Sequence, residues 1–98
     1  MTRIVWTRPA VADLAGVREY IEPDDSSAAA RVVLRITGAV EQLARAPSLG
    51  RPGRVAGTRE LVLVDVPFIV AYRVVAGVVE VLRVLHTSRR WPRRLTRK

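Results

Sequence analysis

The chain has 98 residues, no cysteine, one histidine and a formal net charge of +8 at pH 7. This length fits one domain over residues 1–98 with one modest core, and the composition excludes disulfide bonds, cysteine-bound metals and histidine clusters. The sequence shows no signal-peptide-like apolar segment and no apolar run of membrane-spanning length, so we expect a cytoplasmic protein without cofactor or metal.

The charge is distributed unevenly along the chain. Up to residue 49 the basic and acidic residues balance, whereas residues 51–98 contain eleven basic residues and three acidic ones. Such a surplus attracts nucleic acid, an acidic protein segment or a phosphate-rich surface. A GC-rich coding sequence would explain the preference for arginine over lysine, but it would not explain why the surplus falls in one half.

The first half of the chain predicts a strand and then a helix. Residues 2–7 alternate in polarity, which is typical of a short strand. The helix lies between Pro9, which suits a first turn, and Pro23, which ends it. Its apolar stripe consists of Ala10, Leu14, Val17 and Ile21.

A second helix begins after residues 24–27, whose carboxylate and hydroxyl side chains are suitable N-caps, and ends before Pro47. Gly38 lies inside this helix, and we expect that close packing against the first helix leaves no room for a side chain there. The short connection predicts an antiparallel helical hairpin. The apolar stripe of the second helix consists of Ala29, Val32, Val33, Ile36, Val40 and Leu43.

The second half predicts a loop, three strands and a tail. Residues 47–58 contain three glycines and two prolines and form a loop, which Leu49 and Val55 could anchor to the core. Residues 87–98 form a basic tail that we expect to be partly disordered. The three strands are predicted at residues 59–64, 68–75 and 78–86.

The turn between the last two strands determines how they pair. If residues 76–77 form a two-residue turn, residues whose numbers sum to 153 face each other, and Arg73 lies opposite Glu80. Ala76 is a poor first residue for such a turn. Both faces of these strands are rich in Val and Leu, so we expect the helices to cover one face and leave the other for a partner.

A series of short motifs runs along almost the whole chain and together resembles one family. The motifs are Ile4–Trp6, Ala10, Asp13–Leu14, Tyr20–Ile21, Ala29–Ala30, Leu43, Pro47, Gly50–Arg51, Gly53–Arg54, Gly57–Leu61, Val70–Val74, Leu82–His86 and Trp91–Pro92. In this order and spacing, the chain resembles the RelE/ParE toxin superfamily of bacterial type II toxin–antitoxin systems.

The resemblance implies a fold and a partner. The fold is α+β, with a two-helix hairpin packed on a twisted antiparallel sheet in the order β-α-α-β-β-β. The partner is a cognate antitoxin that wraps a C-terminal segment around the toxin and neutralises it. A basic surface beside an exposed sheet face suits an amphipathic, acidic segment. A homodimer is also possible.

Members of this superfamily have two kinds of target. RelE-like members cut mRNA on the ribosome, and ParE-like members block DNA gyrase. The same fold serves both targets, so only the residues of the functional site can distinguish them. In a nuclease, His86 would transfer protons, and Arg51, Arg54 and Arg59 would neutralise the phosphate. Against this alternative, Ile69 stands where such nucleases often carry an arginine, and the tail has no tyrosine.

The stretches GRPGRVAGTREL (residues 50–61) and VLRVLHTSRRWP (residues 81–92) resemble the ParE-like branch more closely. We therefore favour a protein without catalytic residues, which arrests growth by binding and poisoning DNA gyrase. A non-toxic, basic nucleic-acid-binding module is a further alternative, although the sequence has no recognisable motif for it. The residues expected to bind the target are Arg51, Arg54, Arg83, Arg89, Arg90 and Trp91.

Each candidate side chain also has a structural interpretation. His86 is more typical of a strand-end histidine bonded to a neighbouring loop than of a general base. Arg59 and Glu60 could form an anion site or a structural ion pair at the start of a strand. Tyr72 is expected in the core, with a buried hydroxyl that needs a hydrogen bond. Trp91 is expected to cap the edge of the sheet.

Overall fold

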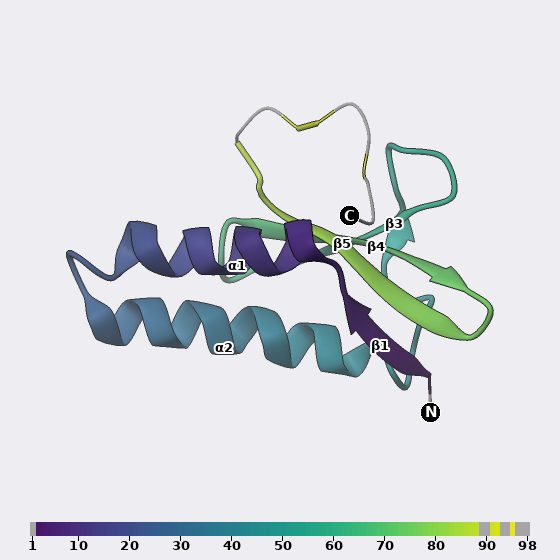
Figure 1. Cartoon of the computed structure of the whole chain (residues 1–98), viewed down its shortest axis with the longest axis horizontal. Helices are drawn as coiled ribbons and strands as arrows, with labels where there is room; N and C mark the ends of the chain where they lie inside the picture. The colour runs from purple at the N-terminus through teal and green to yellow at the C-terminus, as the bar shows by residue number, and fades with distance from the viewer. Residues whose placement is uncertain (1, 89–90, 93–94, 96–98) are drawn as a thin grey trace.

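Two antiparallel helices lie against one face of a five-stranded sheet and extend past its end (Figure 1). The computed structural model describes residues 2–88, 91–92 and 95. The expected α+β fold, with a helical hairpin packed on the sheet, is confirmed. The elements are β1 (Arg3–Trp6), α1 (Arg8–Ile21), α2 (Ser26–Gln42), β2 (Arg51–Pro52), β3 (Arg59–Val62), β4 (Phe68–Val75) and β5 (Val78–His86).

The sheet has the strand order β1-β5-β4-β3-β2 and is mixed, whereas the sequence predicted only antiparallel pairs. β1 runs parallel to β5, with Arg3 beside Val78 and Trp6 beside Val81. A parallel pair needs a long crossover, which here includes the helical hairpin. The two-residue strand β2, which pairs with β3, was missed because its glycine- and proline-rich surroundings indicate a loop.

The β4–β5 pairing confirms the predicted register near the turn. Arg73 faces Glu80, and their side chains form an ion pair with a distance of 2.6 Å between Nε and Oε1. The turn residues Ala76 and Gly77 have φ values of 51° and 74°, as a type I′ turn requires. Beyond Tyr72 an irregularity shifts the register by one, so Ala71 lies opposite Arg83. The spacing of the turn could not predict this shift.

Both helices begin where the sequence predicts. The Thr7 side chain accepts a hydrogen bond from the backbone N–H of Ala10, and Pro9 lies in the first turn of α1. The Asp25 side chain caps α2 by accepting from the N–H of Ala28. Among the described residues, no helix is long and apolar enough to cross a membrane.

The core lies between the hairpin and the sheet. Tyr72, Ile36 and Leu43 are its largest fully buried side chains. Two predictions about this region are wrong. Gly38 is exposed and a Cβ added there would meet nothing within 4 Å, so close packing does not require the glycine. Leu49 is 51% exposed and does not anchor the loop, because polar contacts attach the loop to the sheet instead.

Candidate functional site

Residues 47–60, which we call the arginine loop, are organised around the side chain of Glu60. This side chain is only 3% exposed. Its Oε1 accepts a hydrogen bond from Arg51 Nη2 at 3.2 Å, and its Oε2 accepts from the backbone N and the Nε of Arg54 at 2.9 and 3.2 Å. Glu60 therefore connects the start of β3 to two separate positions of the loop.

The ion pair considered between Arg59 and Glu60 does not form, because successive side chains of a strand point to opposite faces. Arg59 instead donates through Nη1 to the backbone carbonyl of Gly50 at 2.8 Å, with Ser48 O at the limit of 3.5 Å. Tyr72 reaches the same part of the loop, since its hydroxyl donates to Pro47 O at 2.6 Å and accepts from Gly50 N at 2.8 Å. The loop is thus held from both faces of the sheet.

The arginine loop carries a surplus of positive charge. Burial raises the pKa of Glu60, but hydrogen bonds from the Arg54 backbone and from the guanidinium groups of Arg51 and Arg54 outweigh this effect and leave the pKa below its ordinary value. Glu60 is therefore ionised at neutral pH, and it is one carboxylate among the three guanidinium groups of the loop. The side chains of Arg51 and Arg54 remain 58% and 52% exposed. This surface can attract an anionic partner.

Trp91 lies against the arginine loop. The guanidinium carbon of Arg54 is 3.6 Å from the centroid of the Trp91 ring, a distance at which a cation–π contact forms. Trp91 is half-buried, and the structure brings it together with Arg54. The other predicted tail contacts, Arg89 and Arg90, lie outside the described residues.

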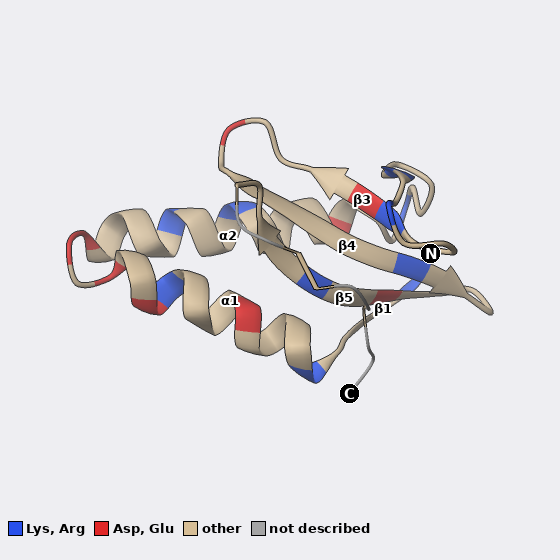
Figure 2. Cartoon of the chain, turned by 90° about the horizontal axis from the view of Figure 1, so that it is seen from above, with Lys and Arg blue, Asp and Glu red and all other residues tan. Residues whose placement is uncertain are grey.

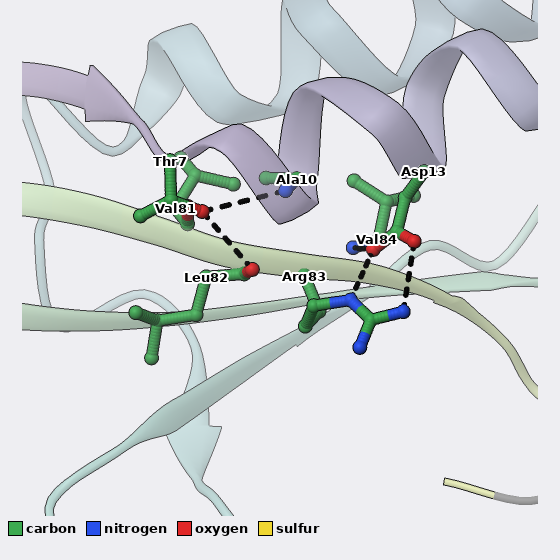
Figure 3. A network of polar contacts seen from close by, with 7 residues as sticks. All are labelled: Thr7, Ala10, Asp13, Val81, Leu82, Arg83 and Val84. Atoms are coloured by element: carbon green, nitrogen blue, oxygen red, sulfur yellow. Dashed lines mark hydrogen bonds and ion pairs between the residues drawn. The ribbon is translucent and has the colours of Figure 1, made fainter. Parts of the chain in front are cut away.

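A second polar cluster joins α1 to β5, and we call it the α1–β5 seam (Figure 3). The Asp13 carboxylate accepts from Nε and Nη2 of Arg83 at 2.6 and 2.9 Å and from the backbone N of Val84 at 2.9 Å. The Thr7 hydroxyl lies 2.8 and 3.2 Å from the carbonyl oxygens of Val81 and Leu82. These contacts bind polar groups of β5 where its pairing with β1 ends.

Arg83, which the sequence assigned to target binding, is engaged inside the molecule. Its side chain is 27% exposed, and its guanidinium makes both hydrogen bonds to the Asp13 carboxylate. Hydrogen bonding to Asp13 raises the pKa of Arg83.

Arg73 on β4 is likewise bound to a carboxylate, that of Glu80 on β5. Figure 2 shows the basic position of β4 beside the acidic position of β5. Among the described arginines after residue 50, Arg73 and Arg83 are thus bound to carboxylates and less than a third exposed. The side chains of Arg51 and Arg54 in the arginine loop stay more than half exposed.

A cavity of about 500 Å³ opens between α1 and the end of β5, and we call it the α1–β5 groove. Gly16 contributes to its size, since a Cβ there would meet nothing within 4 Å. Its lining includes Gly16, Val17, Tyr20, Phe68, Leu85 and His86. In the described part of the chain, no strand pairs with the outer edge of β5 beyond Val81.

His86 forms part of this groove and contacts its own strand end. Its Nδ1 accepts from the backbone N of Ser88 at 3.2 Å and lies 2.9 Å from the Ser88 hydroxyl. Its ring meets Phe68 edge-on, with 5.4 Å between the centroids. The structural interpretation of His86, a strand-end histidine bonded to a neighbouring loop, is confirmed.

The proposed nuclease residues do not gather at one place. His86 pairs with Phe68, whereas Arg59 pairs with Tyr72, four residues further along β4. At about 3.3 Å per residue, this offset alone separates the two positions by roughly 13 Å, and β4 lies between them. Sequence reasoning also missed Asp13 as the partner of Arg83, because the two residues are 70 positions apart.

Comparisons with known proteins find toxins and toxin–antitoxin systems. The family model described as the ParE toxin of the type II toxin–antitoxin system parDE matches residues 4–91. The putative toxin Y4kP of Sinorhizobium fredii is 52% identical over 90 residues, which cover 92% of this chain and 93% of the relative. Toxin RelE2 of Caulobacter vibrioides is 40% identical over 89 residues, covering 91% and 99% of the two chains.

Two solved structures have a similar fold. A chain of the chromosomal ParDE toxin–antitoxin system from P. aeruginosa aligns with a TM-score of 0.83 at 30% identity, covering 90% of this chain and 98% of that one. A chain of the toxin–antitoxin complex RelBE2 from Mycobacterium tuberculosis aligns with a TM-score of 0.59 at 27% identity, covering 87% and 96%. The likeness thus extends over nearly the whole described chain.

Proposed function

The chain belongs to the ParE toxin family of type II toxin–antitoxin systems, and we propose that it arrests growth by binding DNA gyrase stoichiometrically rather than by cutting RNA. In this proposal the bound toxin traps gyrase with its DNA cleaved. The arginine loop and the tail supply the contacts.

The separation of His86 from the arginine loop carries this proposal. RNA cleavage needs a proton-transfer group within hydrogen-bond reach of the same reacting atoms whose charge the arginines neutralise. An offset of roughly 13 Å along the strands is too large for that. Ile69, at the position where related nucleases often carry an arginine, is buried and apolar and cannot bind phosphate.

The target-binding surface that we propose is centred on the exposed guanidinium groups of Arg51 and Arg54, with Trp91 beside them. Its surplus of positive charge suits an anionic surface on gyrase or on gyrase-bound DNA. Arg89 and Arg90 remain proposed contacts outside the described residues. Arg83 is assigned instead to the α1–β5 seam, because its guanidinium is already bound to Asp13.

For the cognate antitoxin we propose the α1–β5 groove as a binding site. Both structural relatives come from toxin–antitoxin systems, which supports a partner of this kind. The groove offers an apolar cavity next to a strand edge that no other strand covers in the described part of the chain. An extended segment could place apolar side chains in the cavity and pair its backbone with β5.

Two similarities favour the RelE-like alternative, since a relative at 40% identity is named Toxin RelE2 and one similar solved structure is of the complex RelBE2. To distinguish the two functions, purified toxin is incubated with gyrase and relaxed circular DNA, and separately with programmed ribosomes. We expect supercoiling to fall in proportion to the toxin-to-gyrase ratio while the mRNA stays intact. Adding the antitoxin should restore supercoiling.

Site-specific mRNA cleavage with unaffected supercoiling would overturn the proposal. Loss of this mRNA cleavage in His86→Ala would then support a nuclease. Expression in cells tests the third alternative, a non-toxic basic module. A toxin arrests growth when it is expressed alone and is rescued by its antitoxin, whereas such a module would do neither.

A further inference from the structure

We infer that Tyr72 is a positioning residue, which holds the arginine loop in its binding geometry from inside the core. Tyr72 lies on β4, is 0% exposed and contacts no solvent. Its role in binding would therefore be indirect, through the loop. This inference rests on the proposed function of the arginine loop as the target-binding surface.

The Tyr72 hydroxyl is placed where it can hold two loop residues at once. It donates to Pro47 O at 2.6 Å and accepts from Gly50 N at 2.8 Å. A hydroxyl has a single donor, so the direction of both bonds is defined. Burial raises the pKa of Tyr72, so the group keeps its proton and remains a donor at neutral pH.

Gly50 is held tightly between three groups. While its N–H binds Tyr72, its carbonyl oxygen accepts from Arg59 Nη1 at 2.8 Å. A Cβ added to Gly50 would lie 2.7 Å from the Tyr72 hydroxyl and ring and 2.9 Å from the carbonyl oxygen of Glu60. The close approach of the loop to Tyr72 therefore depends on glycine at this position.

Arg51 follows Gly50 directly and begins the pairing of β2 with β3, so a shift of Gly50 would be passed on to Arg51. Arg54 is fixed separately, because its backbone N–H binds the Glu60 carboxylate. The arginine loop is thus attached through Tyr72 and Arg59, and separately through Glu60 and the pairing of β2 with β3. Loss of the Tyr72 bonds should let residues 47–50 move while the fold and the attachment at Glu60 persist.

The first variant is Tyr72→Phe, which keeps the buried ring and removes only the hydroxyl. We expect the toxin concentration that half-inhibits the target to rise roughly tenfold, the factor that corresponds to one net hydrogen bond. Antitoxin binding should be unchanged, because the α1–β5 groove lies elsewhere. Hydrogen exchange at the Gly50 amide should become faster.

A stability-matched control separates positioning from a general loss of stability. Ile36→Val shortens a fully buried side chain of α2, away from the loop, and should lower the melting temperature without changing target inhibition. Gly50→Ala provides a second change at the attachment, since its Cβ would push the loop away from Tyr72. It should weaken inhibition at least as much as Tyr72→Phe.

A double-mutant comparison of Tyr72 with Arg51 distinguishes positioning of the loop from a purely structural role. If Tyr72 acts by placing Arg51, Tyr72→Phe should cause a smaller loss in an Arg51→Ala background than in the wild type. Additive losses would contradict the inference, as would wild-type inhibition by Tyr72→Phe or equal losses in Tyr72→Phe and Ile36→Val.

Inhibition by these variants is measured with whichever target the wild-type protein inhibits, gyrase or the ribosome. Failure of the gyrase proposal would appear in the wild type, and failure of the positioning role would appear only in the variants. If the wild type inhibits neither target, unchanged hydrogen exchange at Gly50 in Tyr72→Phe would still overturn the inference.

Discussion

In the α1–β5 seam one carboxylate binds one guanidinium, whereas in the arginine loop one carboxylate binds two and a third guanidinium lies nearby. Asp13 accepts from two of the three guanidinium nitrogens of Arg83, whose side chain is 27% exposed. Glu60 is more deeply buried than Asp13, yet its partners Arg51 and Arg54 stay more than half exposed. The same residue type thus joins two elements in the seam and presents positive charge in the loop.

The difference shows that the number of arginines is a poor guide to a binding surface. A guanidinium that forms a bidentate pair with its own partly buried carboxylate is held within the fold, and removing the pair affects stability first. Guanidinium groups that share a carboxylate keep donors and charge available to a partner. The following predictions test whether the two regions differ in this way.

The largest effect is expected for Asp13→Ala in the seam. This change removes the partner of Arg83 and leaves the N–H of Val84 without its acceptor, so the free energy of unfolding should fall by about 3 kcal/mol. Urea denaturation gives the measurement. The control is Glu22→Ala, which breaks an exposed pair with Arg18 and should cost less than about 0.5 kcal/mol. Equal effects of the two changes would remove the distinction between seam and surface.

A smaller loss is expected for Glu60→Gln in the arginine loop. The amide can still accept hydrogen bonds but has no charge, so stability should fall by about 2 kcal/mol, chiefly through the weakened contacts to Arg51 and Arg54. Target inhibition per folded molecule should also fall, because the attachment of the loop to residue 60 is weakened. Unchanged inhibition would mean that Glu60 only stabilises the fold.

Glu60 also predicts a pH dependence. The pKa of Glu60 is lower in the folded protein than its ordinary value of 4.5. The contribution of Glu60 to the free energy of unfolding is therefore complete above the unfolded-state pKa and is lost as the pH falls through the folded-state pKa. Unfolding midpoints measured from pH 7 to pH 3 should fall more steeply below about pH 4.5 for the wild type than for Glu60→Gln. Parallel curves would contradict the assignment.

The next effect concerns binding rather than stability. Arg51→Ala should raise the half-inhibitory toxin concentration by about tenfold, since an exposed cation facing an anionic partner is lost. The change in unfolding free energy should stay below about 1 kcal/mol, because Glu60 keeps its contacts to Arg54. The loss should be smaller at high salt. A stability loss as large as that of Asp13→Ala would make Arg51 a structural residue.

The smallest effect is a gain expected for Gly38→Ala, outside both regions. The position is exposed within α2 and has free space for a methyl group, so helix propensity alone should add about 1 kcal/mol to the free energy of unfolding. Target inhibition should not change. This variant also offers a more stable background for the Asp13 and Glu60 substitutions, and a loss of stability would show that α2 needs the glycine.

Much of the fold could be predicted because its signals are local. The caps at Thr7 and Asp25 act on N–H groups three residues away, and the turn at Ala76–Gly77 sets the pairing of the residues beside it. The apolar stripes likewise follow from helical spacing. The short strand β2 and the register shift beyond Tyr72 have no comparable local signal, so sequence patterns did not reveal them.

The candidate site was only partly predictable for the same reason. Arg51 and Arg54 could be named from the sequence, and both lie on the exposed arginine loop. Their attachment to Glu60 and Tyr72 could not, and Arg83 was placed with the target contacts because nothing near it in the sequence indicates Asp13. A net charge counts guanidinium groups but does not show which carboxylate each one meets.

The sequence by itself determined the two capped helices, the last hairpin with its Arg73–Glu80 pair and the excess of positive charge, since short-range spacing governs these features. Only the tertiary structure decided which cations remain available. Asp13 and Arg83 are 70 positions apart in the sequence, and Gly50 and Tyr72 are 22 apart. Such contacts form only when folding has brought β1 beside β5 and the loop beside β4. Packing between distant segments, rather than local preference, therefore separates the exposed arginines of the loop from Arg83, which is bound within the fold.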